Sequence, residues 1–327
     1  MIFKKSYTII NFEIINFNRD IGTYCQKIKN FCRVLIVKSF IILVELMMST
    51  EKTYKALLAA DMDCTLLAPG KDVPEGNKEA IRALKGAGVA FTIATGRSSF
   101  LVGKFAEDLG IEVPVITSNG GSLFDAASRK QFASKDFEDS KIRELLRYLL
   151  DNDADATLYS DEGIFFAPRS SRKFFVEGYN VGVEPAKQSP IIDIDRSFPE
   201  LEKIPKFNKI LLIRPNKEIV DRFSGDPDLE FLSSGFDLFD VMCRDVTKGN
   251  ALLSLAEYLG IPAENTFAIG DSDNDISMIE SAKYGIAMGN ATEGVKAAAS
   301  YITANYDSLG FAKAVYEYII PLVNSFS

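Results

Sequence analysis

The sequence of 327 residues contains no histidine. This absence excludes catalysis by an imidazole base, zinc sites with histidine ligands and phosphohistidine chemistry. Cysteine is also scarce: the four cysteines, at positions 25, 32, 64 and 243, form no Cys-x-x-Cys pair, and none has arginine six positions later. A loop of the Cys-x5-Arg type is therefore excluded. Few, scattered cysteines favour a reducing compartment such as the cytoplasm.

Positive charge is in the minority, because the chain has 37 Lys and Arg against 45 Asp and Glu, a net charge of −8. No basic stripe is available to follow a phosphate backbone, so nucleic acid is not an expected partner. With 47% apolar and 25% charged residues the composition is that of a soluble globular protein. The length leaves room for two domains, each with its own core.

The first 48 residues differ from the rest, since they contain no alanine and no proline and carry a net charge of +4. Their apolar run, residues 34–48, includes Lys38 and Glu45 and is too short and too charged for a transmembrane helix. No small-residue cleavage site follows it. We predict that translation begins at Met47 or Met48, that residues 1–48 are a non-native extension, and that residues 49–327 do not associate with a membrane. A membrane-associated leader is the alternative.

A buried strand is predicted at residues 54–60, and it ends in Asp61 and Asp63. Alternate residues of a strand point the same way, so the two carboxylates converge where ligands bind in open α/β sheets. Their repulsion is relieved most simply by a hard dication held by oxygen ligands. The alternative is a capped strand end at which Asp63 opens a turn.

Two further strands with polar ends follow. The strand predicted at 89–94 leads into Thr95 and Gly96, and a hydroxyl and a glycine before a helix can bind an anion. A plain serine N-cap at 98 or 99 is the alternative. The strand predicted at 113–117 leads to Asn119, a candidate substrate contact, although Asn-Gly most often marks a hairpin turn.

From residue 134 to 240 the pattern changes to a helix with apolar residues at helical spacing over 142–150 and four short strands. The strands are predicted at 156–159, 164–166, 207–213 and 229–232. This α+β segment is predicted to be a second domain inserted into the first. The first domain then comprises residues 53–133 and 241–327.

The βα pattern returns at a strand predicted over 240–242, followed by a helix that begins near Lys248. Another strand, 266–269, ends in an acidic stretch that contains Asp271, Asn274 and Asp275. This stretch lacks the glycine and the terminal glutamate of an EF-hand at their required spacings. A final helix is predicted to end at Pro321.

We expect four strand ends of one parallel sheet to bring these groups together. Carboxylates for a metal, a lysine, a hydroxyl and backbone amides suit phosphoryl transfer. A solvated lysine is the alternative for Lys248.

At four ordered motifs the sequence resembles the haloacid dehalogenase superfamily, in particular its Cof-type branch of sugar phosphatases. The family's first motif, Asp-x-Asp-x-Thr-Leu-Leu, matches residues 61–67, and its second matches Ala94-Thr95-Gly96-Arg97. The third matches Lys248-Gly249 and the fourth, Gly-Asp-x-x-Asn-Asp, matches residues 270–275. One departure is Cys64, where glycine is usual; it removes no catalytic group. The resemblance covers about residues 53–327.

The resemblance implies an α/β fold: a Rossmann-like parallel-sheet core with an inserted α/β cap of the C2B type. Only 31 residues separate Asp63 from Thr95, whereas 152 separate Thr95 from Lys248, which leaves room for the cap in the second interval. The implied cap chooses the substrate.

The resemblance also implies the site roles. Asp61 is the nucleophile that becomes phosphoaspartate, and Asp63 is the general acid and base. The resemblance implies that Mg²⁺ is bound by the Asp61 carboxylate, the Asp63 backbone carbonyl and Asp271, with Asp275 behind them. It implies that the phosphoryl oxygens are bound by Thr95, Gly96, Lys248 and Asn274. Arg97 and Asn119 are the implied contacts to the rest of the substrate.

The function predicted from the sequence is hydrolysis of phosphomonoesters of small metabolites, with sugar phosphates first. Phosphates of cofactor precursors, such as a flavin or pyridoxal phosphate, are the alternative substrates. A phosphomutase and a non-catalytic phosphate-binding regulator are the alternative activities. A regulator would be expected to lack Asp61 or Asp63, and both are present.

Overall fold

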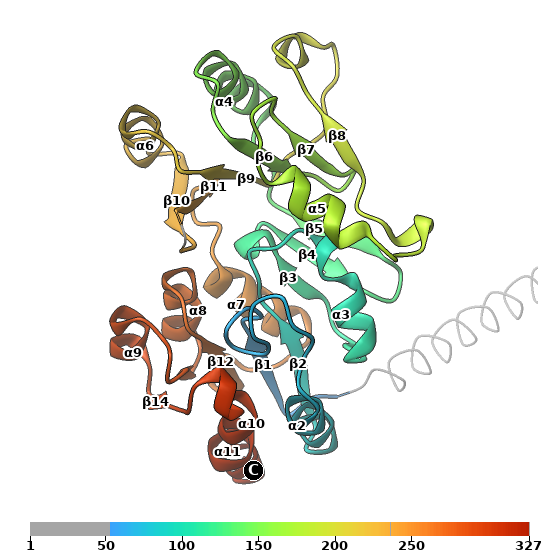
Figure 1. Ribbon diagram of the computed structural model, residues 1–327. Coiled ribbons are helices and arrows are strands. Elements are labelled where there is room, and N and C mark those ends of the chain that lie inside the picture. The colour runs from blue at the N-terminus through green and yellow to red at the C-terminus, as the bar shows by residue number, and fades with distance from the viewer. Residues whose placement is uncertain (1–52, 236, 327) are drawn as a thin grey trace, which may run out of the picture. The chain divides into compact units, whose positions relative to one another are not determined.

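The computed structural model describes residues 53–235 and 237–326 (Figure 1). The predicted extension, residues 1–48, and the predicted start at Met47 or Met48 lie outside them. The first sheet has five strands, all parallel, in the order β14-β13-β12-β1-β2. These strands are β1 (Ala56–Ala60), β2 (Val89–Ile93), β12 (Thr266–Gly270), β13 (Tyr284–Ala287) and β14 (Tyr301–Ile302).

Strands β1, β2 and β12 are mostly apolar because both faces of the sheet are covered. Every residue of β1, β2 and β12 is buried, as parallel sheets require. The α/β class predicted from the sequence is thereby confirmed. Helices flank the sheet: α2 packs against α10, and α7 packs against α8 (Figure 1). The helices are α2 (Glu75–Gly86), α3 (Gly103–Asp108), α7 (Lys248–Tyr258), α8 (Ile276–Ser281), α9 (Glu293–Ala298) and α10 (Gly310–Ala314).

The strand predicted at 113–117 leads into a small antiparallel sheet, β3-β4-β5. Its strands are β3 (Val115–Thr117), β4 (Ser122–Asp125) and β5 (Lys130–Ser134). A parallel bridge between Ala94 and Ile116 places β3 beside the end of β2. Asn119 and Gly120 both have positive φ in the turn between β3 and β4, so the hairpin alternative for this Asn-Gly pair is correct.

A second large sheet has six strands in the order β10-β11-β9-β6-β7-β8. It is antiparallel except for the β7–β8 pair. On it pack α4 (Asp139–Asp151), whose apolar face is buried as predicted, and α6 (Lys217–Ser224); α5 (Lys173–Asn180) follows β7. The strands are β6 (Ala156–Tyr159), β7 (Ile164–Phe166), β8 (Ile191–Asp193), β9 (Lys209–Ile213), β10 (Leu229–Ser233) and β11 (Leu238–Cys243).

The two large sheets have separate cores. A large apolar cluster surrounds the parallel sheet, and a smaller one lies between α4, α6 and the antiparallel sheet. We call the part of the chain around the parallel sheet the first region and the part around the antiparallel sheet the second region. A third, small cluster joins Leu101 of the first region to Tyr159, Phe166 and Val176 of the second. In the part of the chain that the structure describes, no helix is both long and apolar enough to cross a bilayer.

One prediction about the parallel sheet is wrong. The strand predicted at 240–242 was expected in that sheet, yet it is part of β11, which pairs with β9 and β10 in the antiparallel sheet. A short connection joins β10 to β11, and a hairpin between sequence neighbours forms more easily than a distant parallel pairing. Three strand ends of the parallel sheet therefore reach the site, and Lys248 arrives as the first residue of α7.

The end predicted for the last helix is also wrong. The chain stays helical past Pro321, through a π-helical segment (Val315–Ile319) and α11 (Ile320–Asn324). Proline has no N–H to donate. In the first turn of a helical segment the backbone N–H groups have no partner within the helix, so a proline there loses no hydrogen bond. The change from α to π geometry before Pro321 places the proline in such a first turn.

We expect alanine at two glycines of the parallel-sheet region to have opposite effects. A Cβ at Gly285 would lie 2.3 Å from the carbonyl oxygen of Ile279, so Gly285→Ala should lower the free energy of unfolding by about 1–3 kcal/mol. A Cβ at Gly86, the last residue of α2, would meet nothing within 4 Å, so Gly86→Ala should raise that energy by about 0.5–1 kcal/mol. Urea denaturation measures both, and equal effects of the two substitutions would contradict this packing.

Candidate active site

Two carboxylates lie at the carboxyl ends of neighbouring strands. Asp61 follows β1 and Asp271 follows β12, and the two strands pair through Ala60 and Ile269. The amide of Asp61 donates to the carbonyl of Ile269, 2.9 Å away, which fixes the register at this point. The predicted convergence of the Asp61 and Asp63 carboxylates is wrong, because the Asp63 side chain binds Arg97. The meeting of strand ends is present for Asp61 and Asp271.

Lys248 is the cation at the centre of this acidic group. It is fully buried, and its Nζ donates at 2.6 Å both to Asp61 Oδ1 and to Asp275 Oδ1. Burial by itself would lower the pKa of Lys248, but the charges of Asp275 and Asp61 outweigh it and raise the pKa above its usual value. Lys248 therefore stays charged, and the solvated-lysine alternative is wrong.

The carboxylates crowd one another despite this lysine. One oxygen each from Asp61, Asp271 and Asp275 lies within 4.8 Å of the others. Burial and the charge of Asp275 raise the pKa of Asp61 well above its ordinary value. The same two causes raise the pKa of Asp271 to about 6. Three carboxylates and one lysine leave an excess of negative charge, and a set of oxygen donors of this kind fits a hard dication such as Mg²⁺.

Asp275 is held more firmly than the other two carboxylates. Its Oδ2 accepts from the amides of Asp271 and Ser272, at 2.9 and 3.0 Å, while Lys248 occupies Oδ1. Both oxygens are thus used, which fits a place behind the direct metal ligands. A Cβ at Gly270 would lie 2.5 Å from the Asp275 carboxylate, so only glycine fits the strand end at that position.

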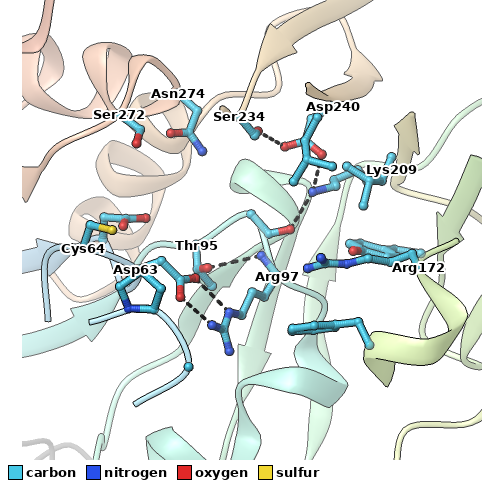
Figure 2. A pocket seen from close by; sticks show the side chains of 18 residues that line it. Asp63, Cys64, Thr95, Arg97, Arg172, Lys209, Ser234, Asp240, Ser272 and Asn274 are labelled. Carbon is cyan, nitrogen blue, oxygen red and sulfur yellow. Dashed lines mark hydrogen bonds and ion pairs between the residues drawn. The ribbon is translucent and has the colours of Figure 1, made fainter. Parts of the chain in front are cut away.

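Asp63 is turned away from this group and toward Arg97. The Arg97 guanidinium donates to both oxygens of the carboxylate, from Nε at 2.9 Å and from a terminal nitrogen at 2.5 Å (Figure 2). The Asp63 side chain is 42% exposed, so it faces the solvent side of the site. Cys64, the next residue, has a φ of 60°, a conformation that favours glycine. This conformation explains why glycine is usual there in the family that the sequence resembles.

The turn after β2 provides the next predicted residues. Thr95 is 2% exposed, and its hydroxyl accepts from the amide of Arg97 at 3.2 Å. The carbonyl of Gly96 accepts from Lys209 Nζ at 2.6 Å, which ties this turn to β9. Ser98 caps the short helical turn Ser99–Leu101 through its backbone alone, since no side-chain cap bond forms.

Asn119 and Asn274 are joined to each other. The side-chain nitrogen of Asn274 donates to Asn119 Oδ1 at 3.1 Å, and the nitrogen of Asn119 donates to Asp240 Oδ2 at 2.6 Å. Asn119 is fully buried and is absent from the cavity wall, whereas Asn274 lines the cavity. The placement of Asn119 supports Asn274 and is not that of a substrate contact.

Lys209 and Asp240 form an ion pair that the sequence reasoning missed. Lys209 Nζ lies 2.5 Å from Asp240 Oδ1, and the two side chains are only 3% and 1% exposed. Both residues stand in otherwise apolar strands, β9 and β11. A charged residue inside an apolar strand was the available signal, because such a residue needs a partner in the folded protein.

A cavity of about 320 Å³ opens between the ends of the parallel strands and the antiparallel sheet. Asp61, Asp63, Thr95, Gly96 and Arg97 line it on one side. Figure 2 shows the opposite wall, where Lys209, Asp240 and Arg172 come from the second region. The cavity thus exposes the predicted reacting groups to a ligand held by both regions.

Comparison with known proteins places this chain in a family. Residues 58–315 match the family model described as haloacid dehalogenase-like hydrolase. Phosphatase YwpJ of Bacillus subtilis is 31% identical over 78% of this chain and 97% of its own length. The 5-amino-6-(5-phospho-D-ribitylamino)uracil phosphatase YwtE of the same organism is 29% identical over 78% of this chain and 95% of its own length.

A solved structure supports the same assignment. It is described as a haloacid dehalogenase-like hydrolase from B. subtilis and superposes with a TM-score of 0.69 at 29% identity, over 80% of this chain and 99% of that one. The chain therefore belongs to the haloacid dehalogenase-like hydrolases and is a hydrolytic enzyme of the phosphatase type for which its relatives are named.

Proposed function

We propose that the chain is a Mg²⁺-dependent phosphomonoesterase of small metabolites that works through a phosphoaspartate on Asp61. The observation that carries this proposal is that Asp61, which lines the cavity together with Asp63 and Thr95, contacts the buried Lys248 behind it. A carboxylate beside a buried cation can attack phosphorus while the cation stabilises charge on the phosphoryl oxygens. The free cysteines Cys64 and Cys243 support a reducing compartment such as the cytoplasm.

The reaction has two halves that use the same two carboxylates. In the first, an oxygen of Asp61 bonds to phosphorus, the ester oxygen departs, and Asp63 supplies its proton. In the second, Asp63 takes a proton from water, whose oxygen attacks the phosphoaspartate and releases phosphate and free Asp61. Arg97 binds both oxygens of the ionised Asp63 carboxylate, which is the form that takes the proton from water. The protonated form that supplies a proton gives up one of these two hydrogen bonds. Lys248, Thr95, the amide of Gly96 and Asn274 would hold the phosphoryl oxygens.

The residues present fit a magnesium ion. Asp61, Asp271 and the backbone carbonyl of Asp63 would hold it, with Asp275 behind them, since both oxygens of Asp275 already accept hydrogen bonds. When bound, the ion supplies positive charge against the carboxylates and the phosphoryl group.

We propose that residues 134–240 act as a cap that chooses the substrate, because β9, β11 and α5 supply one wall of the cavity. Sugar phosphates are the first substrate class. Phosphates of cofactor precursors such as a flavin or pyridoxal phosphate are the second, which the rings of Tyr159 and Phe175 in the wall favour. YwtE is named for such a ring-bearing phosphate. A phosphomutase would release an isomer in place of phosphate.

Asp61→Asn should leave the protein folded and lower phosphate release from an aryl phosphate by about 10⁴-fold or more, because the nucleophile is lost. A neutral side chain is tolerated there, since Lys248 keeps Asp275 as a partner. The matched control is Asp273→Asn, an exposed carboxylate in the acidic stretch, which should keep its activity. Acid quench followed by mass spectrometry should find a phosphorylated peptide that contains Asp61. Substantial turnover by Asp61→Asn would refute the nucleophile.

Magnesium chloride should raise the melting temperature more than sodium chloride of equal ionic strength, because a dication relieves the crowding of Asp61, Asp271 and Asp275. The shift should shrink in Asp271→Asn, which removes a ligand. A chelator should abolish phosphate release by the wild-type chain. Thermal unfolding and a phosphate assay measure these effects, and chelator-resistant turnover would contradict the metal dependence.

Lys209→Met should lower the free energy of unfolding by about 3–5 kcal/mol, because it leaves the Asp240 carboxylate buried without its cation. The double variant Lys209→Met/Asp240→Asn should be destabilised less, since no charge remains unpaired. Urea denaturation compares the two. Equal losses in the single and double variants would show that the pair matters only for packing.

A further inference from the structure

One cation in the wall of the cavity has no carboxylate beside it. Arg172 lies just before α5, and its guanidinium carbon is 3.8 Å from the centre of the Phe175 ring. Its Nε is buried and has no hydrogen-bond partner. Figure 2 shows the side chain entering the cavity from the second region, across from Asp63 and Thr95.

The other cations that line the cavity, one on each side, are neutralised. Arg97 binds both oxygens of Asp63, and Lys209 pairs with Asp240. Within residues 53–235 and 237–326, the Arg172 side chain takes part in no hydrogen bond or ion pair, and the Phe175 ring is its partner. Its backbone carbonyl accepts from the amides of Phe175 and Val176. Arg172 is therefore the wall cation whose donors remain available to a ligand.

The stacked geometry prepares Arg172 for an anion. An aromatic ring at 3.8 Å fixes the plane of the guanidinium and leaves its edge, with the N–H groups, free to donate. A guanidinium edge matches two oxygens of a carboxylate or phosphate through parallel hydrogen bonds. A partly buried charge that lacks a partner in the protein is best satisfied by a ligand of opposite charge.

The reacting phosphoryl group does not account for this cation. In the proposed function that group lies at Asp61 and Thr95, on the side formed by the parallel strands, whereas Arg172 belongs to the opposite wall. A substrate held by both walls would place its leaving group next to Arg172 and Phe175.

We propose that Arg172 binds a second anionic group, carried by the leaving group of the substrate. The preferred substrates are then phosphomonoesters that also bear a carboxylate or a second phosphate, rather than neutral sugar phosphates. This inference rests on the proposed function, since it concerns the substrate of the same site.

Two matched substrate pairs test it on the full-length chain with Mg²⁺. Glucose 1-phosphate and glucuronic acid 1-phosphate, both pyranoses, differ by a carboxylate at C6, and fructose 6-phosphate and fructose 1,6-bisphosphate differ by a phosphate. We expect the wild-type chain to prefer the anionic member of at least one pair in kcat/KM, and the pair that shows the preference identifies the anion.

Substitutions then assign the preference to Arg172. In Arg172→Met the ratio of kcat/KM between the anionic and the neutral member should fall by about 10- to 100-fold, mainly through KM, the range expected for charged hydrogen bonds. Arg172→Lys should recover part of the ratio, because it keeps the charge without the fork. The matched control is Arg169→Met, an exposed arginine of the same loop outside the cavity wall, which should keep the wild-type ratio.

A binding measurement separates this inference from the proposed chemistry. In the Asp61→Asn background, calorimetry should show tighter binding of the anionic member, and adding Arg172→Met should remove the difference. Equal binding of both members, or an unchanged difference in Arg172→Met, overturns the role of Arg172 even where turnover is observed. If the wild-type chain hydrolyses no phosphomonoester but shows the binding difference, the proposed function fails and the anion site stands.

Discussion

The site depends on the ion pairs that the buried Lys248 forms with Asp61 and Asp275. Three carboxylates could not share the carboxyl end of a buried sheet without a cation, and Lys248 contacts two of them at 2.6 Å. The sheet order makes this contact possible, because β12 lies next to β1 and brings Asp271 and Asp275 beside Asp61. The remaining excess of negative charge is what a dication and a phosphoryl group would meet.

A second charged pair connects the two regions at the cavity. Lys209 and Asp240 belong to the antiparallel sheet, yet Lys209 donates to the carbonyl of Gly96 and Asp240 accepts from Asn119. Asn119 in turn accepts from Asn274. The proposed cap therefore contacts the turns that would bind phosphate, so a substitution in the cap can change the geometry of the phosphate site without contact with the reacting atoms.

The sequence was sufficient for the features that depend on local pattern. The buried strands, the face of α4 and the family itself follow from apolar periodicity and motif order, and the structure and comparisons confirm them. Features set by distant partners were missed. The pairing of β11 was one, because an apolar strand does not reveal which sheet it joins. The Lys209–Asp240 pair was another, because its two residues lie far apart in the chain.

Side-chain direction was equally hidden. Arg97 and Asn119 were predicted at the substrate. Arg97 lines the cavity with its guanidinium bound to Asp63, whereas Asn119 is buried between Asn274 and Asp240. Motif spacing gives the position of a residue on the backbone and not its rotamer or its neighbours. Arg172 lies outside every motif, and its place in the cavity wall depends on the folded chain.

The order of the strands along the chain has a consequence during synthesis. β1 is made early, but its partner β12 begins only at residue 266, after the whole antiparallel sheet, which ends at residue 243. Domains tend to form as they leave the ribosome, and pairings between distant segments form last. A nascent chain that stops before residue 248 can complete the antiparallel sheet, yet it holds Asp61 without Lys248 or Asp271. The buried group of Asp61, Lys248 and Asp271 is thus assembled only when nearly the entire chain has emerged, and a truncated product is expected to be inert.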